Sequence, residues 1–151
     1  MTARNASAEW HGDAATGSGR ITVGDGVFEG PYSAQSRFGD EPGTNPEQLI
    51  AAGLAGCYTM ALSKLLCDAG HAPQSLHTDA RVHLRFAEGN VVLSRIDLET
   101  EGQVEAVDQD QFREYANQAK AICPVSRALA GIPEITLSAS LTAADTAPPR
   151  Q

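Results

Sequence analysis

The sequence predicts an α+β protein that folds as one domain. Alternating polar and apolar residues, typical of strands, occur near the start of the chain and again in its second half, and a long, almost wholly apolar segment typical of a buried helix separates them. A chain of 151 residues can bury roughly two-thirds of its extended surface. We expect a domain over residues 1–142 and a flexible tail over residues 143–151, where prolines occur without an apolar pattern.

The beginning of the chain predicts short strands joined by glycine-rich turns. We expect strands over residues 6–10 and 20–23, and a third through Val27 and Phe28. Asp25-Gly26 is a common tight-turn pair and should connect the last two strands.

A long helix should begin after Gly43. Thr44 and Asn45 are both common capping residues, and Pro46 suits the first helical turn. Thr44 and Glu47 have the spacing of a capping box, so Glu47 should lie in that first turn.

The same helix should end near Ala69. Gly70 can adopt the left-handed conformation that stops a helix, and Pro73 prevents its continuation. The middle of the helix is apolar or small on nearly every face, so we expect it to lie between two packed layers. Its apolar run over residues 49–62 is shorter than the roughly 20 residues that span a bilayer, so no membrane insertion is expected.

The second half of the chain predicts a hairpin. In residues 76–86 the even positions are mostly apolar and the odd positions mostly charged, which indicates a strand with one wet face. Gly89 and Asn90 should form the turn, and residues 92–101 alternate in the same way in the return strand.

A second helix and a final strand should follow. Asp108 can cap this helix, whose apolar stripe consists of Phe112, Tyr115, Ala116 and Ala119 and, extended by four residues, reaches Cys123. Pro124 should open a short helix that ends near Gly131, and residues 135–141 alternate in a last strand.

The composition favours a soluble globular protein in a reducing compartment. Apolar residues make up 42% of the chain, and its three cysteines are too few and too scattered for a secreted disulfide framework. The N-terminus lacks the apolar core of a signal peptide, so we expect no export and a cytoplasmic location. A formal charge of −8 and dispersed arginines would repel phosphate backbones, so nucleic acid is not an expected partner.

Two cysteines lie in contrasting local environments. Cys57 lies inside the apolar run, where burial disfavours a thiolate, whereas Cys123 directly precedes Pro124 at a helix start, where unpaired backbone amides favour one. On local grounds Cys123 is therefore the more reactive thiol. Simpler interpretations stay open, because Cys57 can be a small packed hydrophobe and Cys-Pro can merely join two helices. If the two sulfurs meet in space, they can do thiol redox chemistry.

Two charged residues are candidates for activating Cys57. Arg37 precedes the long helix in a polar segment and could supply a cation for a thiolate, although a loop arginine is usually solvated. Glu47 lies ten residues before Cys57, roughly 15 Å away along one helix, so it cannot touch that thiol in its own chain. It could reach the thiol of a second copy in an antiparallel two-fold pair of helices, or it could simply cap its helix.

The remaining sulfur and histidine residues predict no metal or cofactor site. Cys67 lies too far along the same helix to bond to Cys57, and we interpret it as packing. His77 and His83 fall on the wet face of a strand beside arginines, and no Cys and His residues have metal-ligand spacing. A complete phosphate-binding loop and a nucleophile-elbow serine motif are also missing from the sequence.

Five stretches of the sequence, taken together, resemble the OsmC branch of the OsmC/Ohr family, the osmotically inducible protein C and organic hydroperoxide resistance proteins. They occur in family order, cover nearly the whole chain, and comprise residues 31–33, 36–38, 43–50, 55–63 and 119–126. The specific combination is a Thr-Asn-Pro-Glu start, a cysteine ten residues after that glutamate, and a distant Cys-Pro. Arg37 in a Ser-Arg-Phe setting resembles the OsmC arrangement, because the Ohr arginine comes from an earlier loop.

The resemblance implies an α+β fold in which antiparallel sheets wrap around long central helices of an intertwined homodimer. It also implies a thiol-dependent peroxidase, without a cofactor, that prefers organic hydroperoxides to hydrogen peroxide. Cys57 would be the peroxidatic cysteine and Cys123 the resolving cysteine, which reverses the local ranking of the two thiols. Arg37 and Glu47 would form the polar pair beside the reactive sulfur. An external dithiol, such as a lipoyl protein, would reduce the Cys57–Cys123 disulfide.

Two other functions fit the same residues. One is a redox sensor or interaction protein whose cysteine pair signals peroxide without turnover, and the other is a binder of small apolar ligands. The departures from the family are mild: Gly53 replaces a common histidine, Tyr58 replaces a common phenylalanine, and Cys67 is additional. They concern the shape of a pocket more than its chemistry.

Overall fold

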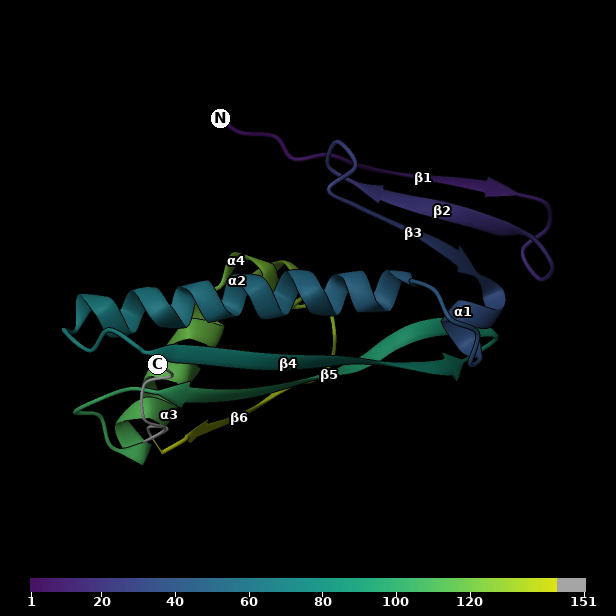
Figure 1. The fold of residues 1–151 in the computed structure, drawn as a ribbon. Coiled ribbons are helices and arrows are strands. Elements are labelled where there is room, and N and C mark those ends of the chain that lie inside the picture. Colours follow the sequence, from purple (N-terminus) through teal and green to yellow (C-terminus); the bar gives the residue numbers. More distant parts are fainter. Residues whose placement is uncertain (144–151) are drawn as a thin grey trace. The chain divides into compact units, whose positions relative to one another are not determined.

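The computed structural model describes residues 1–143 of the chain. Its architecture is α+β, in the order β1-β2-β3-α1-α2-β4-β5-α3-α4-β6, with two separate three-stranded sheets (Figure 1). The chain divides into two compact units, Met1–Ile50 and Ala51–Gln151, and each is described by itself. From residue 144 onward, the predicted C-terminal tail lies outside the described residues.

The first unit contains one antiparallel sheet, formed by β1 (Ala6–His11), β2 (Ser18–Val23) and β3 (Phe28–Ser33). The first two predicted strands are confirmed; the third begins at Phe28, because Val27 lies in the preceding turn, and it extends further than expected. The tight turn predicted at Asp25 and Gly26 connects β2 to β3, and Gly26 adopts a φ of 86°, which glycine reaches without steric cost.

A short helix that the sequence does not predict follows β3 directly. Ser33 caps α1 (Ala34–Phe38): its hydroxyl accepts a hydrogen bond from the Ser36 N–H, and the Ser36 hydroxyl accepts one from the Ser33 N–H. Arg37 therefore lies on a helix and not in a polar loop. Five residues are too few for a helical apolar pattern, so composition alone suggests a loop.

The long helix α2 (Pro46–Asp68) forms as predicted, but its cap differs. The Asn45 side-chain oxygen accepts a hydrogen bond from the Gln48 N–H at 2.9 Å. Thr44 instead donates its hydroxyl to a backbone carbonyl of β3. The predicted capping box between Thr44 and Glu47 is therefore wrong, although Glu47 does lie in the first turn.

The predicted end of this helix is confirmed. Gly70 has a φ of 84°, and the His71 N–H donates to the Leu66 carbonyl at 2.8 Å, which closes the last turn. By length and composition alone, the 23 residues of α2 are enough to cross a membrane. The helix is longer than the apolar run over residues 49–62 on which the sequence-based expectation rests.

The second unit contains the sheet β4 (Ser75–Ala87), β5 (Asn90–Gln103) and β6 (Ile135–Leu141), in that order. β4 and β5 form the predicted hairpin, whose turn has positive φ at Glu88 and Gly89. β6 is parallel to β5, in contrast to the antiparallel sheets that the resemblance implies. Two helices lie between β5 and β6 in sequence, which allows the chain to return to the end at which β5 begins (Figure 1).

A register shift interrupts the pairing of β4 with β5. His83 pairs with Arg95 and Leu84 with Leu93, so the extra residue is Ser94 of β5 and the bulge lies on that strand. The sequence predicts that the even positions of β4 up to Phe86 face inward, but Phe86, near the hairpin turn, is 76% exposed. The inward pattern of β5 is confirmed by its buried residues Ile96, Leu98 and Thr100.

Two helices, α3 (Gln109–Ile122) and α4 (Pro124–Ala128), follow β5. Asp108 caps α3 as predicted, through reciprocal hydrogen bonds with Gln111. Cys123 is the C-cap residue of α3 and the N-cap residue of α4, and it is fully buried. The predicted apolar stripe of α3 faces inward, with Phe112, Ala116 and Ala119 fully buried.

The core of the second unit lies between its helices and the sheet, with α2 running along the strands (Figure 1). The α2 residues in this core recur every four positions, which places them on one helical face. The buried members of the core are Leu54, Tyr58, Leu62, Leu66, Ile96, Leu98, Phe112, Ala119 and Cys123.

The other face of α2 is exposed in a single chain. We call it the outer face of α2; it comprises Gly53, Gly56, Met60, Lys64 and Cys67. Met60 is 76% exposed. The prediction that Cys67 packs in a core is therefore wrong, and the expectation that α2 lies between two layers holds on one side only within one chain.

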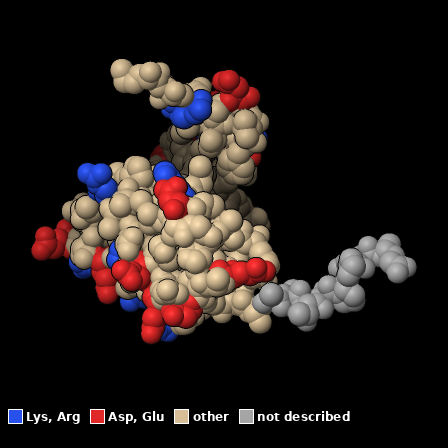
Figure 2. Space-filling view, turned by 90° about the vertical axis from the view of Figure 1, so that its left-hand side faces the viewer, with Lys and Arg blue, Asp and Glu red and all other residues tan. Residues whose placement is uncertain are grey.

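Charged side chains are mixed in sign on the surface. Figure 2 shows acidic and basic residues interspersed on the viewed face, where basic side chains do not gather into a stripe. Surface ion pairs such as Arg81–Glu99 and Arg113–Asp110 join neighbouring charges of opposite sign.

Candidate active site

The two cysteines of the predicted redox pair meet in the core of the second unit. Cys57 comes from the middle of α2 and Cys123 from the junction of α3 and α4, and the Cys57 thiol donates a hydrogen bond to the Cys123 sulfur. Both are free thiols; Cys57 is half-buried and Cys123 is fully buried. Contact between thiols from separate helices is the geometry that disulfide formation requires.

The first turn of α4 holds both sulfurs. The Ser126 N–H donates to the Cys123 Sγ at 3.5 Å, and the Val125 N–H donates to the Cys57 sulfur. Pro124 fixes the direction of this turn at the first helical position, where a missing N–H costs nothing. Successive backbone amides of one short turn therefore point at the two sulfurs.

The environments of the two thiols shift their pKa values in opposite directions. The Val125 N–H lowers the pKa of the Cys57 thiol, but burial and the neighbouring Cys123 thiol outweigh it and raise that pKa above its usual value. Burial raises the pKa of Cys123, but the Ser126 N–H, the Cys57 thiol and the adjacent Ser126 hydroxyl together bring it below its usual value. Within one chain, Cys123 is thus the thiol that ionises first, as its local sequence suggests.

Arg37 and Glu47 form a close ion pair in the first unit. The Arg37 Nη2 lies 2.7 Å from the Glu47 Oε1, and the Nε lies 3.1 and 3.2 Å from the two carboxylate oxygens. The Glu47 side chain is 8% exposed and that of Arg37 is 36% exposed, so the carboxylate is withdrawn from water while the guanidinium keeps access to it. The pairing that the resemblance implies is present, and a planar guanidinium held this way is fixed in orientation.

An aromatic hollow adjoins Arg37 within the same unit. It encloses about 200 Å³, and the rings of Trp10 and Tyr32 lie 5.1 Å apart in its wall, while Phe38 lies under the guanidinium at 5.0 Å. Neither Trp10 nor Tyr32 is a site candidate in the sequence analysis. The available signal is that both are large aromatic residues on short, otherwise polar strands.

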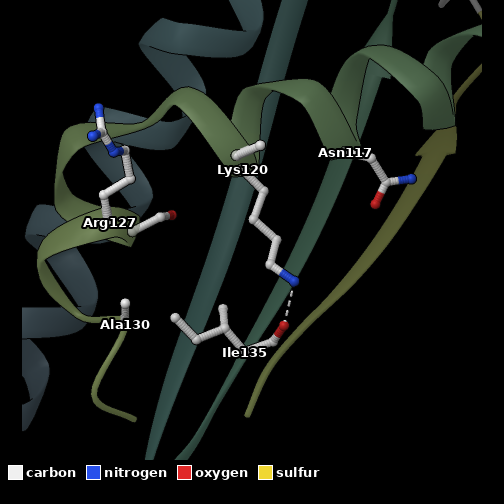
Figure 3. A pocket seen from close by; sticks show the side chains of 7 residues that line it. Asn117, Lys120, Arg127, Ala130 and Ile135 are labelled. Carbon is white, nitrogen blue, oxygen red and sulfur yellow. Dashed lines mark hydrogen bonds between the residues drawn. The ribbon is translucent and has the colours of Figure 1, made fainter. Parts of the chain in front are cut away.

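A second hollow lies between α3, α4 and β6, and contains neither Cys57 nor Cys123. Figure 3 shows Lys120 extending to the Ile135 carbonyl, to which its Nζ donates at 2.5 Å, while the Arg127 guanidinium points away from Lys120. The hollow encloses about 400 Å³. Its other lining residues are Asn117, Ala121, Ser126 and Ala130.

Histidine and acidic residues of the described chain do not assemble a metal site. Among residues 1–143, no three His, Cys, Asp or Glu side chains lie close enough to hold an ion. His83 contacts the Asp97 carboxylate at 2.7 Å, so it faces an acid as well as the arginines that surround it in the sequence. Arg95 also binds Asp97 and, with Thr136 and His83, holds the pKa of that carboxyl well below its usual range.

Comparison with known proteins identifies the family. The family described as OsmC-like protein matches residues 39–138. Peroxiredoxin OsmC of Escherichia coli (strain K12) is 40% identical to this chain over 139 residues, which are 91% of this chain and 96% of that protein.

Solved structures agree with that match. The Organic Hydroperoxide Resistance Protein OhrB of Bacillus subtilis is 27% identical, with a TM-score of 0.68 over 91% of this chain and 98% of that one. An organic hydroperoxide resistance protein OsmC from Legionella pneumophila, at 22% identity, shares the fold with a TM-score of 0.71 over 95% of this chain and 100% of its own. Because the family match and the Escherichia coli relative both span most of the sequence, the chain belongs to the OsmC-like protein family.

Proposed function

We propose that this protein is a cysteine-based peroxidase that reduces organic hydroperoxides, and hydrogen peroxide less well, through a Cys57–Cys123 cycle. The observation that carries the proposal is the hydrogen bond between these two thiols in the core. The names of its relatives support it, since they are a peroxiredoxin and organic hydroperoxide resistance proteins. Apolar residues around the thiols favour organic substrates over hydrogen peroxide.

The proposed cycle has three balanced steps. The Cys57 thiolate attacks the terminal peroxide oxygen, the O–O bond breaks, and the leaving alkoxide takes a proton to become the alcohol while Cys57 becomes a sulfenic acid. Cys123 then attacks that sulfur, which forms the disulfide and releases water. An external dithiol, which a lipoyl protein could supply, reduces the disulfide and is itself oxidised.

Arg37 and Glu47 supply the charge that the cysteine pair lacks in this proposal. Burial and Cys123 raise the pKa of Cys57, so a nearby cation is needed to make its thiolate abundant near neutral pH. The Glu47 carboxylate binds the Nε and Nη2 of Arg37, which leaves the Nη1 to face a thiolate or a peroxide oxygen. Glu47 would thereby orient the guanidinium, and Arg37 would touch the reacting atoms.

The proposed assembly is a homodimer that covers the outer face of α2. Two glycines on that face allow close approach of a second helix, and Met60 offers an exposed apolar side chain between them and Lys64. An isologous pair is the commonest symmetric oligomer. We place the dimer in the cytoplasm, with neither membrane nor nucleic acid as a partner.

Steady-state consumption of cumene hydroperoxide with dithiothreitol tests the proposed function. We expect turnover by the intact protein, none by Cys57→Ser, and a single oxidation without disulfide formation by Cys123→Ser. Cys67→Ser is the matched control and should keep full activity, since it exchanges sulfur for oxygen with little change in size and Cys67 is not part of the pair. One oxidation without turnover by the intact protein would indicate a sensor instead, and activity retained by Cys57→Ser would exclude the assigned roles.

A further inference from the structure

We propose that Ser126 is a positioning residue for Cys123, whose hydroxyl and backbone N–H hold the Cys123 sulfur and stabilise it as the departing thiolate when the disulfide is reduced. This inference rests on the proposed function, because it concerns the reduction step of the same cycle. It assigns a role to a residue that the motif analysis leaves without one.

The geometry around Ser126 supports this role. Ser126 lies three residues after Cys123 in the first turn of α4, and its N–H donates to the Cys123 Sγ at 3.5 Å. The side chain is on the same turn and is 7% exposed. Within residues 1–143 its hydroxyl has no hydrogen-bond partner. A buried hydroxyl without a partner is unfavourable, so this hydroxyl, on the turn whose N–H already binds the Cys123 sulfur, is available to donate to that sulfur once it carries a negative charge.

Hydrogen-bond donors, and not cations, favour the Cys123 thiolate in the part of the chain that the structure describes. They are the Ser126 N–H, the Cys57 thiol, the Ser126 hydroxyl and the Val125 N–H. Once the disulfide has formed, Cys57 has no thiol proton to donate. The two groups of Ser126 and the Val125 N–H are then the remaining donors for the leaving sulfur.

These donors to the Cys123 sulfur act when the disulfide is reduced. One thiolate of the external dithiol attacks the Cys57 sulfur, the S–S bond breaks, and its electron pair moves to the Cys123 sulfur. A leaving thiol with a lower pKa departs faster. The second thiol of the reductant then attacks the mixed disulfide at its own sulfur, which frees Cys57 and leaves the reductant oxidised. Ser126 acts only on the first of these departures.

The second hollow makes a conservative rescue possible. Ser126 lines this hollow of about 400 Å³, so there is room beside it for one additional methyl group. Ser126→Thr therefore keeps the hydroxyl, whereas Ser126→Ala removes it. Ser126→Gly is a second hydroxyl-free variant should the alanine protein fail to fold.

A thiolate titration tests the inference without peroxide. In a Cys57→Ser, Cys67→Ala background, the ultraviolet absorbance of the Cys123 thiolate is followed against pH. We expect Ser126→Ala to reduce the ratio of thiolate to thiol about tenfold at a fixed pH within the titration. Ser126→Thr should restore the ratio, and Ser138→Ala, at an exposed position of β6, should leave it unchanged.

The rate of disulfide reduction tests whether the same residue acts in the cycle. In the protein with all its cysteines, Ser126→Ala should slow reduction of the preformed disulfide by dithiothreitol roughly threefold, while the first oxidation of Cys57 keeps its rate. An unchanged Cys123 titration in the hydroxyl-free variants overturns the role of Ser126. Failure of the proposed function looks different, because the intact protein would then show no peroxide turnover whatever the titration gives.

Discussion

At the scale of single residues, the thiolates of Cys123 and Cys57 depend on different groups for their stabilisation. Cys123 is stabilised as a thiolate by donors on its own turn, whereas burial disfavours the Cys57 thiolate. A nucleophile raised in pKa is poorly ionised at neutral pH, so an attacking Cys57 depends on a cation from outside its own core. In the proposed cycle the guanidinium of Arg37, held by Glu47 through its Nε and Nη2, supplies this charge.

Arg37→Ala should therefore slow the attack on cumene hydroperoxide about 100-fold at neutral pH, because the thiolate and the peroxide both lose their cation. The sign of the pH dependence follows from the same cause. Without Arg37 the pKa of Cys57 stays at the raised value that burial and Cys123 impose, so the loss in rate should shrink with increasing pH, down to the part caused by the missing contact with the peroxide. Stopped-flow oxidation across pH measures this; Arg20→Ala, at an exposed ion pair of the same unit, is the control. A pH-independent loss, or no loss, would contradict the assigned role.

At the scale of elements, sequence and structure agree where local chemistry decides. α2 is predictable because capping residues, Pro46 and Gly70 mark its ends. Its uniform apolar composition, however, conceals which face is exposed, and this is why Cys67 is assigned to the core in error. Alternation likewise predicts an inward Phe86, but it does not report that the turn end of β4 is left exposed.

The candidate site, like the fold, can be predicted from the sequence only where local chemistry decides. Local sequence suggests a reactive Cys123, but no local pattern reports that Cys57 lies against it, because the distance between two helices depends on the packing of the whole core. Only the resemblance to a family links these residues before the structure does. The role of Ser126 escapes sequence reasoning for a related reason: its burial and its missing hydrogen-bond partner exist only in three dimensions.

One close contact between elements makes a sharp stability prediction. A Cβ at Gly102 of β5 would lie 2.6 Å from the ring of Phe112, the first buried residue of α3. Gly102→Ala should therefore push α3 from the sheet and lower the free energy of unfolding by about 1–3 kcal/mol. Chemical denaturation measures this change. Gly131→Ala, where a Cβ meets nothing within 4 Å, should be nearly neutral, and equal effects of the two substitutions would argue against the contact.

At the scale of the whole molecule, the outer face of α2 is the feature that a single chain does not explain. A 23-residue helix with apolar and small residues on both sides buries only one side in its own core. Membrane insertion of α2 would draw Cys57 away from Cys123 at the α3–α4 junction, whereas a second copy would cover the face and leave the two thiols in contact, as the proposed homodimer requires.

Met60→Asp should separate that dimer into single chains. The substitution buries an unpaired carboxylate wherever a second α2 packs against this face, and such a charge is strongly unfavourable. Analytical ultracentrifugation of the intact protein should give twice the mass of one chain, and of the variant one chain. Gln118→Asp adds the same charge at an exposed position of α3 and should not dissociate the dimer. A Met60→Asp protein that remains dimeric would place the interface elsewhere.

The shared first turn of α4 also bears on how long an oxidised Cys57 survives. In the proposed cycle, neighbouring amides hold Cys57 and Cys123 in contact before oxidation, so a sulfenic acid at Cys57 would form beside its resolving thiol. A second peroxide, which would carry the sulfur on to an irreversible sulfinic acid, must compete with a partner that is already in place. The arrangement thus favours resistance to inactivation at high peroxide, at the expense of a lingering signal that other proteins could read.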